Sequence, residues 1–97
     1  MENQNVFVRN AVITVGTTAI LVSNARERVM LYLRNASTGG QSITVVFGEQ
    51  TVASGAGIVL APNDFMTESD SGDYQCWRGQ ISGIASGAGG SLVVVER

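Results

Sequence analysis

Apolar and polar residues alternate in short runs along most of this chain, and turn residues separate the runs. Residues 29–35 (VMLYLRN) are the clearest case, because Val29, Leu31 and Leu33 fall on one face of an extended strand and polar or bulkier residues fall on the other. The strand-like runs recur about every ten residues, with Gly, Asn or Asp between them. They span 11–15, 19–23, 29–35, 43–47, 58–60, 65–69, 74–77, 81–85 and 91–96.

This pattern predicts an all-β fold, a small antiparallel β-sandwich that is jelly-roll-like. The 97 residues allow one domain, which we expect to span residues 11–97. No window sustains helical periodicity. The one alternative is the segment SNARERVM (23–30), where Ser23 or Asn24 could cap a single helical turn.

Two runs break the alternation, since residues 19–22 (AILV) and 92–95 (LVVV) are apolar at every position. In one interpretation they are central strands, or their outward side chains simply face water, as single apolar residues often do. In the other, a neighbouring subunit covers their second faces. Burial of apolar surface contributes about 25 cal/mol per Å2, so we favour the second interpretation and predict that Ile20, Val93 and Val95 lie at a subunit interface.

The charge pattern supports assembly rather than nucleic-acid binding. Only 14% of the residues are charged, below the roughly 25% of typical soluble domains, while 44% are apolar. The net charge is −2, whereas nucleic-acid-binding domains usually carry a basic excess. All six basic residues are Arg, which suits fixed bidentate contacts with carboxylates. We therefore expect protein partners and no nucleic acid.

The residues that catalysis commonly uses are scarce. The chain has no His and no Lys, so it can form neither a Ser-His-Asp triad nor a Schiff base. The single Cys76 excludes an internal disulfide and, without His, nearly every structural zinc site. We predict that Cys76 is a buried thiol, that the protein is not an enzyme, and that it uses no cofactor.

Two further features leave alternatives open. The acidic residues Asp64, Glu68, Asp70 and Asp73 could bind a cation, but their spacing matches no EF-hand loop, and solvated turns are the favoured interpretation. Trp77 and Arg78 form either an interface or sugar-stacking anchor, or a Trp half-packed at the rim of the core. The N-terminus shows no signal-peptide pattern, and no apolar run approaches the roughly 18 residues of a membrane span.

Four segments together resemble small β-sandwich structural proteins of tailed bacteriophages. They are ITVGTTAILVSNARERVMLYLRN, ITVVFGEQ, GIVLAPNDFM and WRGQISGIASGAGGSLVVVER, and the match covers residues 13–97. It is a pattern of strands and turns and contains no catalytic signature. The resemblance implies a virion protein made in the host bacterial cytoplasm. Such proteins decorate or cement capsids or belong to head fibres and tail appendages, commonly as homotrimers.

The resemblance also implies roles for particular residues. Arg26 and Arg28 would make surface contacts, and residues 1–10, which precede the match, would form an N-terminal arm with Phe7 and Val8 as apolar anchors. We therefore expect a capsid decoration protein that binds its own copies and the major capsid protein. The alternative is a tail or head-fibre module that binds a receptor or glycan through Tyr32, Tyr74 and Trp77.

Overall fold

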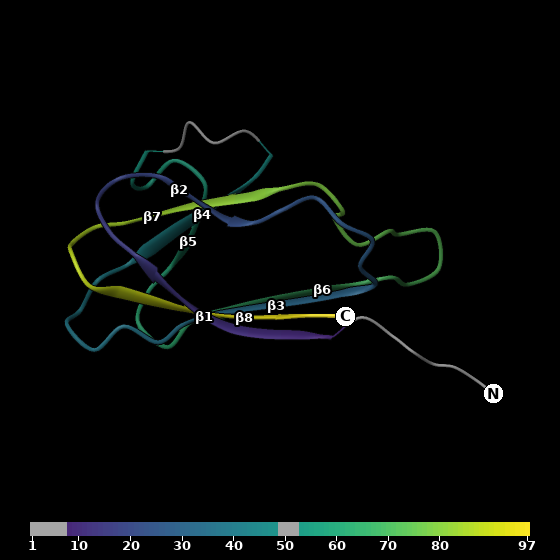
Figure 1. Cartoon of the computed structure of the whole chain (residues 1–97), viewed down its shortest axis with the longest axis horizontal. Helices are drawn as coiled ribbons and strands as arrows, with labels where there is room; N and C mark the ends of the chain where they lie inside the picture. The colour runs from purple at the N-terminus through teal and green to yellow at the C-terminus, as the bar shows by residue number, and fades with distance from the viewer. Residues whose placement is uncertain (1–7, 49–52) are drawn as a thin grey trace.

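The computed structural model describes residues 8–48 and 53–97 and contains eight β-strands (Figure 1). The alternating runs of the sequence correspond to these strands, because side chains on successive residues of an extended chain point to opposite faces. The strands are β1 (Arg9–Val15), β2 (Ile20–Ser23), β3 (Met30–Asn35), β4 (Ile43–Phe47), β5 (Ile58–Leu60), β6 (Phe65–Ser69), β7 (Ile81–Ala85) and β8 (Gly90–Glu96).

The strands form two four-stranded antiparallel sheets, in the orders β1-β8-β3-β6 and β2-β7-β4-β5 (Figure 1). Their pairings are nested: β1 pairs with β8, β2 with β7, β3 with β6 and β4 with β5. The chain thus behaves as one long hairpin with β4 and β5 at its tip, rolled so that the other successive strands alternate between the sheets. This is the eight-stranded jelly roll, and the predicted fold class is confirmed.

The core lies between the sheets and is built by alternate residues of the central strands. In β8, Leu92 and Val94 are fully buried while Val93 and Val95 are only half-buried. In β3, Leu31 faces the core in the same way. The buried apolar set is Val15, Val22, Leu31, Leu33, Ile43, Val45, Leu60, Cys76, Ile81, Ala85, Leu92 and Val94.

The first two strands differ in detail from the sequence-based expectation. β1 begins at Arg9, so the sheet includes two residues that the sequence pattern places in the N-terminal arm. In β2, the pairing with β7 shifts between Leu21 and Ser23. This β-bulge allows the consecutive residues Val22 and Ser23 both to be buried, while Leu21 stays 47% exposed. Burial still alternates over Ile20, Leu21 and Val22, so the bulge accounts for the burial of Ser23 and not for the apolar side chain of Leu21.

One predicted strand is absent, and the alternative of a helical turn is not realised. Residues 74–77 form no strand but part of the connection between β6 and β7, where their backbone is held by side chains described below. Residues 23–30 contain no helical turn, and the chain runs there as an irregular link between β2 and β3. The part of the chain that the structure describes holds no helix that could cross a membrane.

Asn35, at the end of β3, joins the loop between β3 and β4 to the end of β5. Its side chain is fully buried. Its Nδ2 donates to the carbonyl oxygens of Gln41 and Leu60, at 2.8 Å each, and its Oδ1 accepts from the backbone N–H of Ser37 at 2.9 Å. The last contact is an Asx-turn, which starts the loop after the strand. One amide thus fixes the loop between β3 and β4 against the end of β5.

Candidate interaction surface

The β1-β8-β3-β6 sheet has one face that points away from the core, and half of the residues on it are apolar. On it, Val12 of β1 lies opposite Val93 of β8, which in turn lies opposite Arg34 of β3. Arg34 lies opposite Phe65 of β6. Directly opposed residues of antiparallel strands share a face, so these side chains form one row across the sheet. Its two ends, Val12 and Phe65, are 68% and 61% exposed.

A second apolar row runs beside the first. Val95 of β8 lies opposite Tyr32 of β3, and Met30 lies two residues before Tyr32 on the same face. The Tyr32 ring stacks on Phe65, with centroids 5.8 Å apart and planes 30° apart. We refer to both rows together as the outer apolar face. Its members are Val12, Met30, Tyr32, Phe65, Val93 and Val95.

The outer apolar face carries little charge. Among the residues of its four strands that point outward, Arg34 is the only charged one; the polar ones are Asn10, Thr14, Thr67, Ser69 and Ser91. Val93 and Val95 are half-buried because β8 is a central strand and its neighbours cover their flanks. The central-strand interpretation of the LVVV run thus accounts for part of its burial. Contact with a neighbouring subunit stays a prediction.

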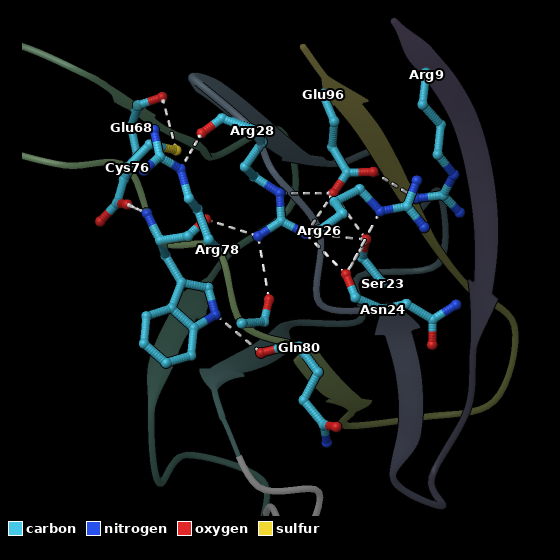
Figure 2. A network of polar contacts seen from close by, with 12 residues as sticks. Arg9, Ser23, Asn24, Arg26, Arg28, Glu68, Cys76, Arg78, Gln80 and Glu96 are labelled. Atoms are coloured by element: carbon cyan, nitrogen blue, oxygen red, sulfur yellow. Dashed lines mark hydrogen bonds and ion pairs between the residues drawn. The ribbon is translucent and has the colours of Figure 1, made fainter. Parts of the chain in front are cut away.

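Beneath one end of this face, on the core side, lies a polar network centred on Glu96 (Figure 2). Glu96 continues the inward series of Leu92 and Val94 and is completely buried. Its Oε1 accepts from Arg9 Nη1 at 2.8 Å, and its Oε2 accepts from Ser23 Oγ at 2.7 Å and Arg28 Nε at 3.0 Å. A buried carboxylate is tolerated only when it is paired in this manner.

Arg28 provides the opposite charge and is also buried, with 1% of its surface exposed. Its guanidinium has five N–H donors. Besides Glu96, they reach the carbonyl oxygens of Trp77 (2.7 Å), Gly79 (3.1 Å) and Asn24 (3.0 Å). The prediction that Arg28 makes surface contacts is wrong, because every nitrogen of its guanidinium is engaged inside the subunit. The planar guanidinium offers more N–H donors than the ammonium group of Lys, and this favours Arg over Lys at this position.

The network connects elements that lie far apart in the sequence. Arg9 belongs to β1, Ser23 to β2, Arg28 to the β2–β3 link and Glu96 to β8, and the Trp77 carbonyl lies on the β6–β7 connection. Because β1 and β8 belong to one sheet and β2 to the other, the ion pair fixes the sheets to each other at this end of the sandwich. The outer apolar face is therefore presented on a rigid support.

Glu96 makes the stability of the fold pH-dependent. Burial raises its pKa, but the hydrogen bonds from Arg9 and Ser23 and the charges of Arg28 and Arg9 outweigh burial, so the pKa lies below its usual value of 4.5. A carboxyl whose pKa is lower in the folded state contributes stability above its unfolded pKa, and this contribution is lost as the pH falls through the folded pKa.

We therefore expect the free energy of unfolding to fall as the pH is lowered below about 4.5, the ordinary pKa of Glu. Glu96→Gln should be less stable than the wild type at pH 7 and should lose less stability on acidification. Denaturant titrations followed by the fluorescence of Trp77, the single Trp, measure both. Glu27→Gln, which removes an exposed carboxyl, is the matched control. Equal acid dependence in Glu96→Gln and wild type would contradict the assignment.

The acidic residues of the β6 region hold the β6–β7 connection. Glu68 accepts from the Trp77 backbone N–H at 2.9 Å and from the Tyr74 hydroxyl. The hydrogen bond to Glu68 raises the pKa of Tyr74. Asp70 accepts from the Cys76 backbone N–H at 2.8 Å. These carboxylates satisfy loop N–H groups, and in the described part of the chain no group of three or more His, Cys, Asp or Glu residues is arranged to hold a metal ion.

Trp77 is packed into the subunit at the rim of its core. Its ring stacks on Phe47 with centroids 5.7 Å apart, and its indole N–H donates to the Gln80 carbonyl at 2.9 Å. Tyr32 lies on the opposite side of the β1-β8-β3-β6 sheet from Glu68, which holds the Tyr74 hydroxyl and the Trp77 backbone. The structure therefore does not bring the three predicted sugar-stacking aromatics onto one platform.

Arg78 also makes contacts within the subunit. It is half-buried, pairs with Asp70 at 3.0 Å and donates from Nε to the Arg28 carbonyl at 3.0 Å. Burial raises the pKa of the nearby Cys76 thiol, and the charge of Glu68 adds to this. Cys76 is buried, as predicted. An interface role for Arg78 stays a prediction, but it would use a side chain already oriented by two partners.

The remaining predicted interface residues are scattered. Ile20 is half-buried and packs against the core of its own subunit, so no neighbour is needed to explain it. Val8 is 53% exposed and directly precedes β1. Arg26 is half-exposed, and its backbone N–H donates to the Arg78 carbonyl at 2.9 Å. Phe7 lies outside the described residues.

Sequence reasoning missed the two most exposed positions of the outer apolar face, Val12 and Phe65, and the buried role of Glu96. The signal for Glu96 was present, because the period of two that places Leu92 and Val94 in the core also places Glu96 there. A buried carboxylate then requires a cation. The cation itself could not be found in this way, since Arg28 lies in an irregular segment without periodicity.

No pocket is found in the structure as described for residues 8–48 and 53–97. The outer apolar face is thus the strongest candidate for a functional surface. Comparisons of the chain with models of known protein families, with curated proteins and with solved structures found no match.

Proposed function

We propose that this chain is a structural protein of a bacteriophage virion, which decorates the capsid and stabilises it through contacts with the shell and with its own copies. The outer apolar face carries the proposal: a sheet surface that exposes Val12 and Phe65 and has a single charge. The assignment to a virion rests on the resemblance of residues 13–97 to phage proteins of this architecture. The chain acts by binding, and no reaction is involved.

The size of the face indicates how such binding would work. Four strands about 4.8 Å apart and five to seven residues long, at about 3.4 Å per residue, present roughly 400 Å2. A stable protein–protein contact covers about 800 Å2 on each partner. A single subunit would therefore bind weakly through this face alone. A shell presents many identical sites, so linked subunits would bind it with higher overall affinity because they make several contacts at once.

Stabilisation of the shell follows from linkage. A protein that binds only the assembled shell shifts the equilibrium away from the dissociated capsid proteins by mass action. The rigid support beneath the face adds to this effect, because little conformational freedom is lost when a preorganised surface binds. The polar network around Glu96 supplies that rigidity at one end of the sandwich.

The experiment is to count copies of the chain by quantitative mass spectrometry in purified particles of the phage that encodes it. We expect hundreds of copies per particle for a decoration protein. Phe65→Asp should abolish retention on the particle, because it places a charge in the contact. Val59→Asp, which changes a 46% exposed residue on the other sheet, is the matched control and should be retained.

Two outcomes would count against the proposal. Absence of the chain from purified particles would exclude a virion role. A few copies per particle would point instead to the tail or head-fibre alternative, and binding of the purified chain to a glycan array would support that alternative.

A further inference from the structure

The sandwich has four edge strands, β1 and β6 in one sheet and β2 and β5 in the other. An edge strand exposes unpaired backbone groups, and proteins usually protect it by short length, bulges, Pro or charge. β5 has three residues, and β2 has four and a bulge. β6 has five residues, follows Pro62 closely and is flanked by Asp64 and Asp70. These three edges are protected.

β1 lacks every one of these devices. It has seven residues, contains no Pro and pairs with β8 without a register shift. Its only charged residue is Arg9, whose side chain points inward to Glu96. Val12, at its centre, is the most exposed large apolar side chain among the described residues. β1 is thus a regular edge without outward charge that is open to another strand.

The hydrogen bonds of β8 show which groups of β1 point outward. The carbonyl of Ser91 accepts from Ala36, and the backbone of Arg97 exchanges hydrogen bonds with Met30. The odd-numbered residues of β8 therefore direct their backbone groups to β3, and the even-numbered ones direct theirs to β1. Residues 9, 11, 13 and 15 of β1 pair with these even-numbered residues.

Since backbone groups alternate in direction along a strand, the N–H and C=O groups of Asn10, Val12 and Thr14 point away from the sheet. We infer that this edge pairs with β1 of a second copy of the chain, antiparallel, about a two-fold axis at Val12. In this register Asn10 faces Thr14 of the second copy and Val12 faces its own equivalent. All outward groups of the three residues are then paired, in roughly six hydrogen bonds.

The second copy fits this edge because the strand is complementary to itself. In this register the seven residues centred on Val12 overlap completely. Side chains that face the core lie opposite core-facing side chains of the second copy, and side chains on the outer face lie opposite outer-face side chains. The interface is isologous, as a two-fold dimer requires. The two β1-β8-β3-β6 sheets then form one continuous eight-stranded sheet. The resemblance to phage proteins implied trimers, whereas this edge specifies a pair.

The pairing would also enlarge the surface available for the proposed contact with the shell. Only this enlarged contact rests on the proposed function. Joining two sheets edge to edge places their outer apolar faces side by side and doubles the area to about 800 Å2. That area reaches the roughly 800 Å2 per partner of a stable contact. A dimer would therefore bind a shell as a unit through a surface that a single subunit lacks.

The test compares two Pro variants of the full chain. Val12→Pro removes an outward N–H that the subunit itself does not use, and edge strands tolerate Pro at such positions. Thr67→Pro removes an outward N–H from the other edge, β6, and is the matched control. Sedimentation equilibrium should give the wild type and Thr67→Pro twice the chain mass of 10.2 kDa. Val12→Pro should dimerise at least tenfold more weakly, since two hydrogen bonds are lost.

Hydrogen exchange separates edge pairing from packing of the apolar faces. In the wild-type dimer, the amides of Asn10 and Thr14 should exchange slowly, and in Val12→Pro they should exchange at the rate of exposed amides. Val12→Lys, which keeps the backbone intact and places two like charges opposite each other, should weaken the dimer as well. It serves as the second variant if the Pro variant does not fold.

Three results would overturn the inference: a wild type that stays monomeric up to about 1 mM, a trimer that Val12→Pro and Val12→Lys leave intact, or a dimer in which the Asn10 and Thr14 amides exchange freely. The measurements use the pure chain and no particle. Failure of the pairing is therefore distinguishable from failure of the proposed virion role, which copy counting tests independently.

Discussion

Replacing Arg28 with Met is expected to lower the free energy of unfolding by about 3–5 kcal/mol, the cost of removing one partner of a buried ion pair. Glu96 would remain buried and would lose two contacts to Arg28, at 2.9 and 3.0 Å. The carbonyl oxygens of Trp77 and Gly79 would lose their donor as well. Small domains are stable by only about 5–15 kcal/mol, so the variant should be close to unfolding at 25 °C.

Urea unfolding followed by the fluorescence of Trp77 measures this loss. Arg26→Met is the matched control, because Arg26 lies in the same irregular link but is half-exposed, and it should cost less than about 1 kcal/mol. Adding Glu96→Gln to Arg28→Met should cost less than the sum of the two single changes, since the buried charge is then removed. An Arg28→Met variant within about 1 kcal/mol of the wild type would show that the ion pair does not hold the sheets together.

Replacing Asn35 with Asp is expected to cost about 2–4 kcal/mol at pH 7, although the two side chains have nearly the same shape. The new carboxylate would face the carbonyl oxygens of Gln41 and Leu60, which now accept from the amide at 2.8 Å. It has no donor for either of them, and an unsatisfied buried polar group costs about 1–3 kcal/mol. Only the bond from Ser37 would be kept.

The pH dependence of Asn35→Asp gives a second test. Burial and the two facing carbonyl oxygens should raise the pKa of the new carboxyl, because both disfavour its charged form. The destabilisation relative to the wild type should therefore be greatest above the raised pKa and should shrink as the pH falls and the carboxyl becomes protonated. Asn63→Asp, at an exposed turn position, is the control and should show no such recovery. A loss of stability in Asn35→Asp that does not change with pH would contradict this explanation.

The sequence predicted the strands best where a strand is regular and one of its faces is buried. The runs that became β3, β4, β6, β7 and β8 were placed to within one residue at each end. In β3 and β8 the alternation records burial on one face, which is a local property of an extended chain, whereas β4 and β7 are buried on both faces over most of their length and are marked by their apolar content. Residues 74–77 look equally strand-like, but Glu68 and Asp70 hold them as an irregular segment. These contacts come from residues six to nine positions earlier, and no periodicity reveals them.

The candidate surface was predicted only in part. The LVVV run predicted an interface role for Val93 and Val95, and the structure places both residues half-buried on the outer side of β8. Val12 and Phe65 were missed because each is a single apolar residue in a short run, and only the register of four strands brings them into one row with Val93. Arg28 was misplaced at the surface, since arginine is usually exposed and its buried partner is 68 residues away.

The sequence by itself determined that the chain folds as antiparallel strands around one core and that it contains neither His nor Lys. Period-two alternation and residue content are properties of the chain that need no knowledge of its partners in space. The tertiary structure alone decided which apolar residues form a continuous outer face, that Arg28 and Glu96 meet inside the sandwich, and that β1 is left as an unprotected edge. The physical reason is that strand order and register join residues distant in the sequence, and the rolled topology sets which surfaces are buried and which stay open.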